Sequence, residues 1–490
     1  METGRYNVLL MSASFFFIMG GYSPTQNFAT TLLDLPCLPL GSICIGLLYV
    51  VMAFASFVAP VFIRRMGPKR TMCIASLTYP LFIVSAVFIV SPLMVVLAVL
   101  IGLFAALLNT AQGALQTDCC NDSNRGLHNG IFTAFNQGAG LIGNLAAIFL
   151  IKNSSDDADA AARHRCDEGG IALVVLGWQP RDSPFFLALA ALSIVGCCLL
   201  TRLRPMPRAE AQDAETAGTA GAALRQTAAL LFSPVMRDFV PLFLYTGLSQ
   251  VFWSGMFTAE LQDSEAIGVV MCILSVAEMA GGLLWGRAID AMGDARRTAV
   301  LVLLTQLGAL AVAWQATRAG AQIGLAYCAG ALLGVADAGI FVVTFALITK
   351  RFVEGDAASA PPQHEHAATL LSPAATDEAG ALKRAPAFSG ADAFGVFFFT
   401  NSLLTGVGFF VIPLLRDDFL VETLFVAGFE LFSVACLFFP ASAVTAAAQG
   451  SATKQQQQQQ QEQQGHGDGA RRRRTSGALI NTCNTSNTRS

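Results

Sequence analysis

Two acidic residues stand inside long apolar stretches of this sequence. Glu278 lies near the middle of the apolar run 266–286, and Asp337 lies near the middle of the run 321–349. An ionisable side chain inside a membrane-spanning helix costs about 2.5–3.5 kcal/mol on insertion scales, so each acid calls for a role. Burial disfavours the charged carboxylate, so either group could hold a proton at neutral pH. A carboxyl group that gains and loses a proton suits a proton- or cation-coupled carrier. A protonated acid that bonds a neighbouring helix is the structural alternative.

A second group of candidate residues is polar but uncharged. Asn109, Gln112 and Gln116 are separated by three and four residues, so they share one face of a helix. Facing one cavity together, such side chains would form a hydrated, mostly uncharged binding site. Singly, each more often bonds a neighbouring helix than a ligand. The other members of the group are Gln26, Asn27, Asn136, Gln137, Asn144, Gln250, Trp253 and Asn401.

Charged residues that could form a gate lie just beyond the run 266–286. They are Asp290, Arg296 and Arg297. An aspartate at a helix end can hold nearby arginine side chains in a charge clasp at the membrane face. We therefore expect Asp290 to pair with Arg296 or Arg297 and to hold one closed state. The alternative is that these arginines only set the topology of the chain.

A second candidate gate combines charges from two other helix ends. Asp118 and Arg125 border the turn after the run 93–117, and Arg64 and Arg65 follow the run 41–63. Asp118 could pair with Arg64 or Arg65 across the loops and act as part of the gate. An ordinary interfacial charge is the alternative interpretation of Asp118.

The elements that must position these residues are long apolar helices. The chain has 490 residues, of which 54% are hydrophobic and 13% charged, and its mean hydropathy is +0.56. A soluble domain carries about 25% charged residues, so composition indicates a membrane protein. Apolar segments within a bilayer must be helical, because a lone strand leaves its backbone groups unpaired. We predict an all-α fold with about twelve spans near 8–33, 41–63, 71–90, 93–117, 127–151, 182–203, 237–260, 266–286, 298–317, 321–349, 387–412 and 419–440.

The distribution of Lys and Arg predicts how the chain crosses the membrane. Basic residues follow the second, fourth, sixth, eighth and tenth spans, whereas most of the intervening loops contain few. By the positive-inside rule both termini are cytoplasmic. Asn153 begins the glycosylation sequon Asn153-Ser154-Ser155 in a loop that this topology places outside. The sequence does not distinguish the plasma membrane from an internal membrane.

The polar segments divide the chain into parts. Residues 1–203 and 237–440 are the two six-helix bundles, and residues 204–236 form a cytoplasmic linker between them. Residues 352–386 form an insert rich in Ala, Pro and His, and residues 441–490 a tail with a Gln run and an Arg run. Both polar segments are expected to be disordered, because they contain too little apolar surface to fold.

A repeat relates the two bundles. Each has a Met-Gly turn followed by basic residues, and the glycines Gly67 and Gly293 are 226 residues apart. The second copy resembles the loop signature G-x-x-x-D-x-x-G of the major facilitator superfamily. The first copy departs from it, because Pro60 and Arg64 stand where Gly and Asp would be. A duplicated unit with this signature predicts two pseudo-symmetric bundles around a central site.

Several motifs resemble one branch of that superfamily, the uncoordinated-93-like family. These motifs lie at residues 26–32, 48–60, 64–70, 112–119, 124–132, 277–281 and 334–337. The resemblance covers about residues 5–440 and is looser in the second half, where 341–344 lack the family's Asn-Thr-Gln. It implies a major-facilitator fold. Members of the family include regulatory subunits of potassium channels, escorts of receptors between membranes, and presumed transporters.

Other classes of function find no support in the sequence. No nucleophile, base and orienting group cluster in the loops, so we expect neither an enzyme nor a cofactor. No Cys or His spacing resembles a metal site. Most of the 12 cysteines lie in apolar runs, and a bridge between the two outer ones, Cys37 and Cys166, is left open. The net charge of −3 indicates no nucleic-acid partner.

Two hypotheses of function remain from the sequence. The first is a carrier that moves a small solute or ion through the bilayer by alternating access. The second is a regulatory subunit of a channel, or an escort of a receptor, that keeps the fold without transport. The expected partners are the lipid bilayer with a solute or ion in the first case, and a channel or receptor subunit in the second.

Overall fold

The structure is a computed structural model of the chain. It describes residues 2–32, 34–35, 38–85, 87, 89–153, 175–176, 183–206, 220–261, 264–318, 323–357, 388–411 and 419–439. The chain divides into two units, Met1–Phe438 and Phe439–Ser490. All described residues except Phe439 belong to the first unit, which contains every helix and strand named below.

The first half of the chain forms six membrane-crossing segments. The third predicted span consists of two helices that meet at Leu77, and the other five are single helices. Four strands of two residues each pair as β1 with β2 and β3 with β4. The helices are α1 (Glu2–Leu32), α2 (Leu40–Met66), α3 (Pro68–Ser76), α4 (Thr78–Ser85), α5 (Ser91–Cys119), α6 (Arg125–Asn153) and α8 (Ser183–Leu200). The strands are β1 (Asp34–Leu35), β2 (Leu38–Pro39), β3 (Ile89–Val90) and β4 (Val175–Leu176).

The second half forms six further segments. Its first segment changes from an α-helix to one π-helical stretch, η1, before it ends. A π-helical turn inside an α-helix is rare and is often found at functional sites. The elements are α12 (Val240–Val251), η1 (Phe252–Phe257), α13 (Thr258–Glu260), α14 (Ser264–Met292), α15 (Ala295–Arg318), α16 (Ile323–Ala357), α17 (Gly390–Val411) and α18 (Phe419–Phe438).

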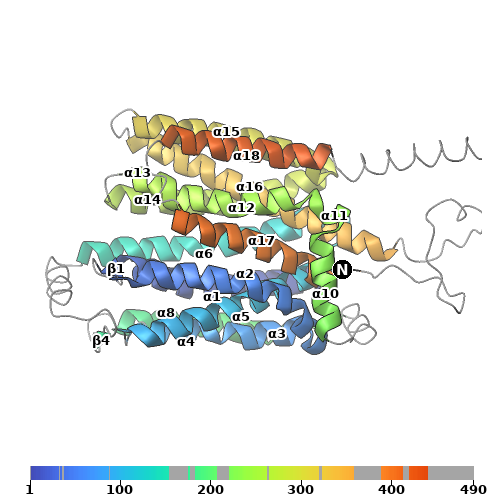
Figure 1. Cartoon of the computed structure of the whole chain (residues 1–490), viewed down its shortest axis with the longest axis horizontal. Coiled ribbons are helices and arrows are strands. Elements are labelled where there is room, and N and C mark those ends of the chain that lie inside the picture. The colour runs from blue at the N-terminus through green and yellow to red at the C-terminus, as the bar shows by residue number, and fades with distance from the viewer. Residues whose placement is uncertain are drawn as a thin grey trace, which may run out of the picture. The chain divides into compact units, whose positions relative to one another are not determined.

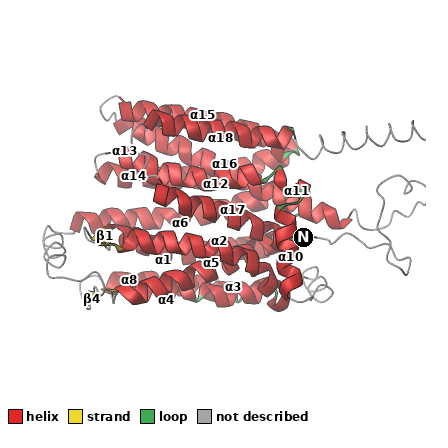
Figure 2. Ribbon diagram, viewed as in Figure 1, coloured by secondary structure: helices red, strands yellow, loops and turns green. Residues whose placement is uncertain are grey.

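These helices confirm the predicted fold class. Their axes lie roughly parallel to one another, with the first-half helices in the lower part of Figure 1 and the second-half helices in the upper part. Helices make up almost all of the described part, and the short strands lie at one end (Figure 2). Seven described helices are long and apolar enough to cross a membrane by themselves. The remaining segments are shorter, split or more polar.

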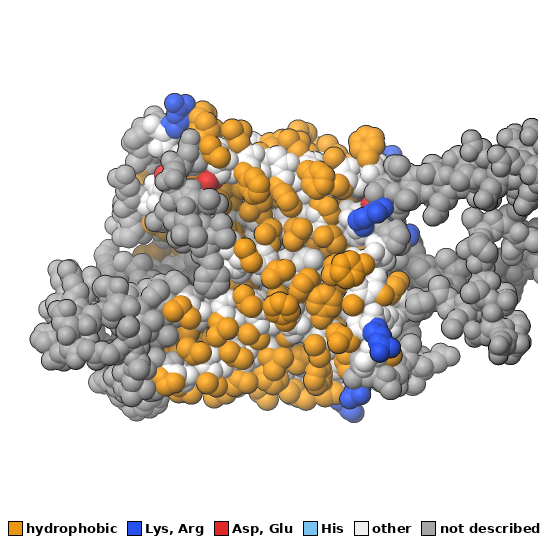
Figure 3. Space-filling view, in the orientation of Figure 1, with side chains coloured by type: hydrophobic (Ala, Val, Ile, Leu, Met, Phe, Trp, Pro, Cys, Tyr) orange, Lys and Arg blue, Asp and Glu red, His pale blue; other side chains and the backbone are white. Residues whose placement is uncertain are grey.

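The surface matches a bilayer environment. Apolar side chains cover the middle of the face in Figure 3, and most visible Lys and Arg side chains gather at one end. Exposed leucines and phenylalanines such as Phe54, Leu304 and Phe425 stand out from the bundle at about 60% exposure. Lipid is the solvent in which such side chains are stable outside a core. We call the end that carries Arg64, Arg65, Arg296 and Arg297 the basic end.

The repeat seen in the sequence has one common geometry. Gly67 and Gly293 have positive φ angles of 76° and 66°, in the left-handed region that favours glycine. The Gly67 N–H donates to Ile63 O at 2.8 Å, and the Gly293 N–H donates to Ile289 O at 2.9 Å. Each glycine therefore ends a long helix and starts the next one after a tight turn.

The two most extensive contacts between the halves are α6 with α14 and α2 with α17. Small residues allow the first pair to approach closely. A Cβ added at Gly282 would lie 2.9 Å from both Ala134 N and Gly130 O, and one added at Gly130 would meet Gly282 O even more closely. In the second pair, the Phe399 ring of α17 packs against Phe57 of α2, with the ring centroids 4.3 Å apart.

The segment predicted as a linker contains structure. Helices α10 (Ala220–Leu231) and α11 (Pro234–Arg237) lie within it, and α10 packs against both α2 and α17. In Figure 1, α10 crosses the basic end of the bundle. The first residues of the predicted insert, 352–357, continue α16, and residues 358–386 lie outside the described part. The predicted tail 441–490 also lies outside it.

Candidate functional site

The acids Glu278 and Asp337 come together at the contact between the halves. Glu278 is on α14, Asp337 is on α16, and their side chains are 3% and 1% exposed. The Gln137 side chain of α6 donates from Nε2 to Glu278 Oε1 at 3.1 Å and to Asp337 Oδ2 at 3.3 Å. One amide from the first half thus bridges two carboxyl groups of the second half.

Further polar groups surround this acid pair. Ser249 of α12 donates from Oγ to Asp337 Oδ1 at 2.9 Å. The Trp253 side chain of η1 lies beside Asp337, but its buried indole N–H makes no hydrogen bond of normal geometry. Asn136 donates from Nδ2 to Gln137 Oε1 at 3.2 Å, which fixes the bridging amide from its other side. Trp253 occupies this position as the second residue of the π-helical turn, two residues after α12 ends.

Within the described part of the chain, neither acid of the pair forms an ion pair with a basic side chain. The two ion pairs in the described part of the chain are Arg64 with Asp392 and Arg125 with Asp122. Two adjacent buried carboxylates cannot both stay charged without a counter-ion, because burial and mutual repulsion both oppose ionisation. The pair is therefore suited to hold a proton or a small cation.

The polar residues of α5 divide into two kinds. Asn109 donates from Nδ2 to Ala105 O of its own helix at 2.9 Å. Gln112 and Gln116 are fully buried, and neither side-chain amide has a hydrogen-bond partner. An unpaired buried amide costs about 1–3 kcal/mol, so these two side chains are available for a ligand or water.

Two further polar candidates, Asn401 and Gln250, join helices. Asn401 donates from Nδ2 to Thr246 Oγ1 at 2.8 Å, which joins α17 to α12. Gln250 of α12 donates to the hydroxyl of Tyr49 on α2 at 3.5 Å, across the two halves. The side chains of Gln26 and Asn27, on α1, lie outside the described part.

At the basic end, Arg64 pairs with Asp392 of α17, an acid that the sequence did not single out. Both side chains are buried, and the guanidinium contacts both carboxylate oxygens. The carboxylate also accepts from Thr227 Oγ1 at 2.8 Å, and Arg64 Nη1 donates to Gln226 Oε1 at 3.0 Å. Because Thr227 and Gln226 belong to α10, this helix connects α2 with α17.

A second polar contact between the halves involves Asp290. Its carboxylate accepts from the backbone N–H groups of Gly126 at 2.6 Å and Leu127 at 2.7 Å. Negative charge at the first turn of α6 is favourable, because the first amides of a helix have no partner within it. Arg296 and Arg297 are exposed, and the described part of the chain contains no ion pair between either one and Asp290. The expected clasp is thus replaced by a helix cap.

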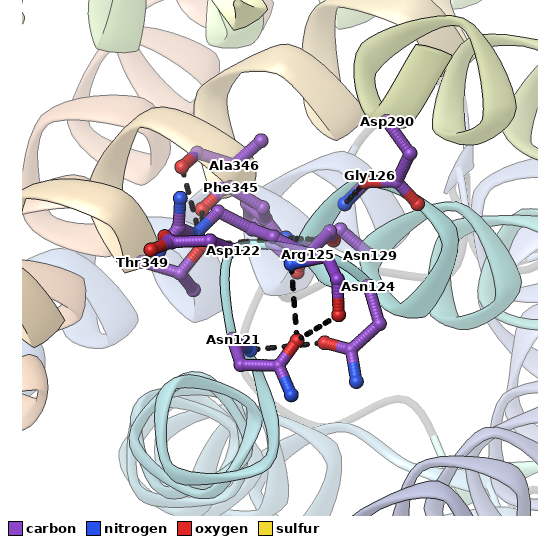
Figure 4. Close-up of polar contacts among 11 residues, drawn as sticks. Asn121, Asp122, Asn124, Arg125, Gly126, Asn129, Asp290, Phe345, Ala346 and Thr349 are labelled. Atoms are coloured by element: carbon purple, nitrogen blue, oxygen red, sulfur yellow. Dashed lines mark hydrogen bonds and ion pairs between the residues drawn. The ribbon is translucent and has the colours of Figure 1, made fainter. Parts of the chain in front are cut away.

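Figure 4 shows the surroundings of this cap. Arg125 donates from Nη2 to Asp122 Oδ1 at 2.8 Å, and Arg125 is 6% exposed. Asn129 donates from Nδ2 to Thr349 Oγ1 of α16 at 3.4 Å. The start of α6 therefore contacts both α14 and α16.

The other gate candidates differ in exposure. Arg65 is exposed, and Asp118 is half-buried near the end of α5. Arg64 reaches Asp392 where Asp118 was expected. Asn153 is the last residue of α6, and its side chain lies outside the described part. Cys37 and Cys166 also lie outside it, whereas the described cysteines are free.

Sequence reasoning missed three buried acids or hydroxyls. Asp392 begins an apolar run and Glu430 interrupts one, which is the same signal that identified Glu278. Ser249 carried no signal, because a serine in an apolar helix is common.

Among the described residues, no group of three His, Cys, Asp or Glu side chains could hold a metal ion.

The fold defines the class of protein. Solved major facilitator structures share the fold. The proton:xylose symporter XylE is 12% identical with a TM-score of 0.59, and the match covers 88% of this chain and 94% of XylE. The E. coli fucose:proton symporter FucP is 12% identical with a TM-score of 0.59, and the match covers 90% of this chain and 99% of FucP. At this identity the likeness shows the fold alone. The chain is an integral membrane protein of major-facilitator type.

Within this class, the chain belongs to the UNC-93 family. The family model described as "Ion channel regulatory protein UNC-93" matches residues 40–314, more than half of the chain.

Curated relatives agree with this family. UNC93-like protein MFSD11 of Xenopus tropicalis is 25% identical over 308 residues, 57% of this chain and 65% of the frog protein. UNC93-like protein 3 of Arabidopsis thaliana is 28% identical over 283 residues, 54% of each chain. Protein unc-93 homolog A of Bos taurus is 26% identical over 367 residues, 69% of this chain and 79% of the bovine one. The chain thus spans less than two thirds of the frog protein.

Proposed function

We propose that this chain is a carrier that moves a small polar solute across the membrane by alternating access, coupled to a proton or cation. The observation that carries the proposal is the bridge from Gln137 to Glu278 and Asp337. It joins a donor of one half to two acids of the other half. When the halves rock apart, this donor must leave the acids, so the charge state of the pair and the position of the halves depend on each other.

The uncharged residues support the choice of solute class. Gln112 and Gln116 offer amide donors and acceptors that no protein group uses. Amide groups bind hydroxyl and amide groups of a solute through hydrogen bonds at no cost in net charge. We therefore propose a neutral or zwitterionic polar solute rather than a multiply charged ion.

The basic end provides the gate in this proposal. Asp392 with Arg64, and Asp290 with the first turn of α6, join the halves there. We propose that this end faces the cytoplasm and that both contacts break when the carrier opens inward. Arg65, Asp118, Arg125, Arg296 and Arg297 then supply the positive-inside charge and local contacts. Asn153 is proposed as an external glycosylation site.

A proteoliposome assay tests the proposal. Purified protein is reconstituted with a pH-sensitive dye inside, and labelled hexoses, nucleosides and neutral amino acids are added in turn. We expect one class of solute to enter with proton movement, and Glu278→Gln to reduce coupled uptake at least about tenfold. Glu260→Gln is the matched control, because Glu260 is exposed at the end of α13.

A second candidate function is a regulatory subunit of a channel or an escort of a receptor. It is favoured by the description of the matching family, which names ion channel regulation. This candidate predicts no flux of any solute class, together with co-purification of a channel or receptor. In that case Glu278→Gln would preserve the association, whereas changes on the lipid-facing or loop surface would weaken it.

A further inference from the structure

A second buried polar cluster lies inside the second half, away from the helix pairs that join the halves. Its members are Tyr245 of α12, Gln306 of α15 and Glu430 of α18. Each side chain is at most 2% exposed. Helix α18 packs against both α12 and α15, so three helices bring the cluster together.

Four polar atoms of this cluster are close to one another but are not satisfied by hydrogen bonds of normal geometry. The Tyr245 hydroxyl lies beside the Glu430 carboxyl and the Gln306 amide. Yet Tyr245 OH, Glu430 Oε2 and both amide atoms of Gln306 make no hydrogen bond of normal geometry. Buried polar groups are nearly always hydrogen-bonded, so three such groups together without bonds indicate an occupant between them.

The charge of Glu430 indicates what this occupant is. Neither of the two ion pairs in the described part of the chain includes Glu430. A buried carboxylate without a counter-charge is very unfavourable. One carboxylate and two neutral oxygens balance a single positive charge, whereas a divalent ion would leave net charge buried. Oxygen ligands of this kind suit hard cations.

We propose that Glu430, Gln306 and Tyr245 form a binding site for a dehydrated monovalent metal cation, Na⁺ or K⁺. The carboxylate, the amide oxygen and the phenol oxygen are its protein ligands. The site is distinct from the pair Glu278 and Asp337. Tyr245 also interacts electrostatically with Asp337, so a bound ion would change the electrostatic potential at that pair. The proposal holds whether or not the chain transports a solute.

Thermal unfolding of the purified full-length protein in a neutral detergent tests this site. The melting temperature is measured in increasing NaCl or KCl, with N-methylglucamine chloride keeping the ionic strength constant. Because a ligand of the folded state stabilises it in proportion to the logarithm of its excess over Kd, we expect a rise of several degrees with one of the two metal ions. Glu430→Gln should abolish this rise, and the exposed control Glu260→Gln should retain it.

A second variant and two outcomes make the test decisive. Gln306→Met removes one oxygen ligand at similar size, and it should raise the salt concentration at half-effect at least about tenfold. If the parent melts equally in all three salts, Glu430 holds a proton and the proposal is overturned. If Glu430→Gln responds to the salts like the parent, the ion binds elsewhere and the proposal is likewise overturned. Where Glu430→Gln fails to fold, the same conclusion follows if Gln306→Met responds like the parent.

Discussion

Buried acids in this chain are stabilised in three different ways. Asp392 has a basic partner, Arg64, and three hydroxyl or amide donors around it. Glu278 and Asp337 share an amide donor from the other half but no basic partner. Glu430 has neither. The difference matters, because a fully paired carboxylate is structural, whereas an incompletely paired one is free to bind a proton, an ion or a solute.

The ion pair Arg64–Asp392 gives a prediction at the residue scale. Removal of one partner from a buried ion pair costs about 3–5 kcal/mol, because the other charge stays buried without compensation. We expect Asp392→Asn or Arg64→Gln alone to lower the melting temperature strongly in detergent. The double variant should be more stable than either single variant. Arg65→Gln, the exposed neighbour, serves as the control.

Two results of these melting experiments would contradict the prediction for the ion pair Arg64–Asp392. Two single variants that melt like the parent would mean that the pair contributes little net stability and that α2 and α17 are held by apolar packing alone. A double variant as unstable as the sum of the two single variants would mean that the groups act independently.

At the scale of elements, glycines decide which helices meet. Gly126, Gly130, Gly282 and Gly286 lie on facing sides of α6 and α14, and an added Cβ at any of them would collide with backbone of the other helix. Gln137 and Glu278 are on the same two helices, further from the basic end. The close approach of the backbones therefore positions the bridging hydrogen bond as well as the cap on Asp290.

Gly282→Leu is the corresponding prediction. The new side chain would force α14 away from Ala134 and Gly130 of α6, and overpacking costs about 1–3 kcal/mol or more where backbone must move. We expect a lower melting temperature in detergent. We also expect loss of the coupled solute uptake that is proposed for this chain. Gly428→Leu on α18 is the matched control, because an added Cβ there has nothing within 4 Å. Equal effects of the two substitutions would refute a role for this contact.

At the scale of the whole molecule, the two bundles are joined by direct packing of their helices and by helix α10, which contacts both bundles. Helix pairs α6–α14 and α2–α17 link the halves, and α10 contacts both partners of the second pair. The positive-φ glycines Gly67 and Gly293 mark the same turn in each half. Each half thus contains the same turn, and the acid pair with its bridging amide lies where the halves meet, which agrees with the proposed carrier.

Separate expression of the halves tests this organisation. Residues 1–212 and 213–490, produced as two chains in one cell, should assemble, because the contacts between the halves do not need a covalent link. Co-purification of the untagged half with the tagged half is the measurement. Gly126→Leu with Gly130→Leu in the first half should reduce the yield severalfold. Independent purification of each half would contradict the prediction.

Much of this fold follows from the sequence alone. Apolar runs must be helical in a bilayer, and the observed helices match the twelve expected spans, although the third is split into α3 and α4. The repeated Met-Gly turn predicted two related halves, since only glycine readily adopts the positive φ at Gly67 and Gly293. The cost of burying an acid singles out Glu278 and Asp337 from the sequence alone.

Partners, by contrast, depend on distances between residues that are far apart in the chain. Arg64 lies 328 residues from Asp392, and Gln137 lies 141 residues from Glu278. Charge and spacing allowed Arg64 to pair with Asp118 and Asp290 to pair with Arg296. Only the packing of α2 on α17 and of α6 on α14 chose Asp392 and the first turn of α6 instead. Local sequence determines which segments are helical and apolar, whereas the tertiary contact between the halves decides which polar groups meet.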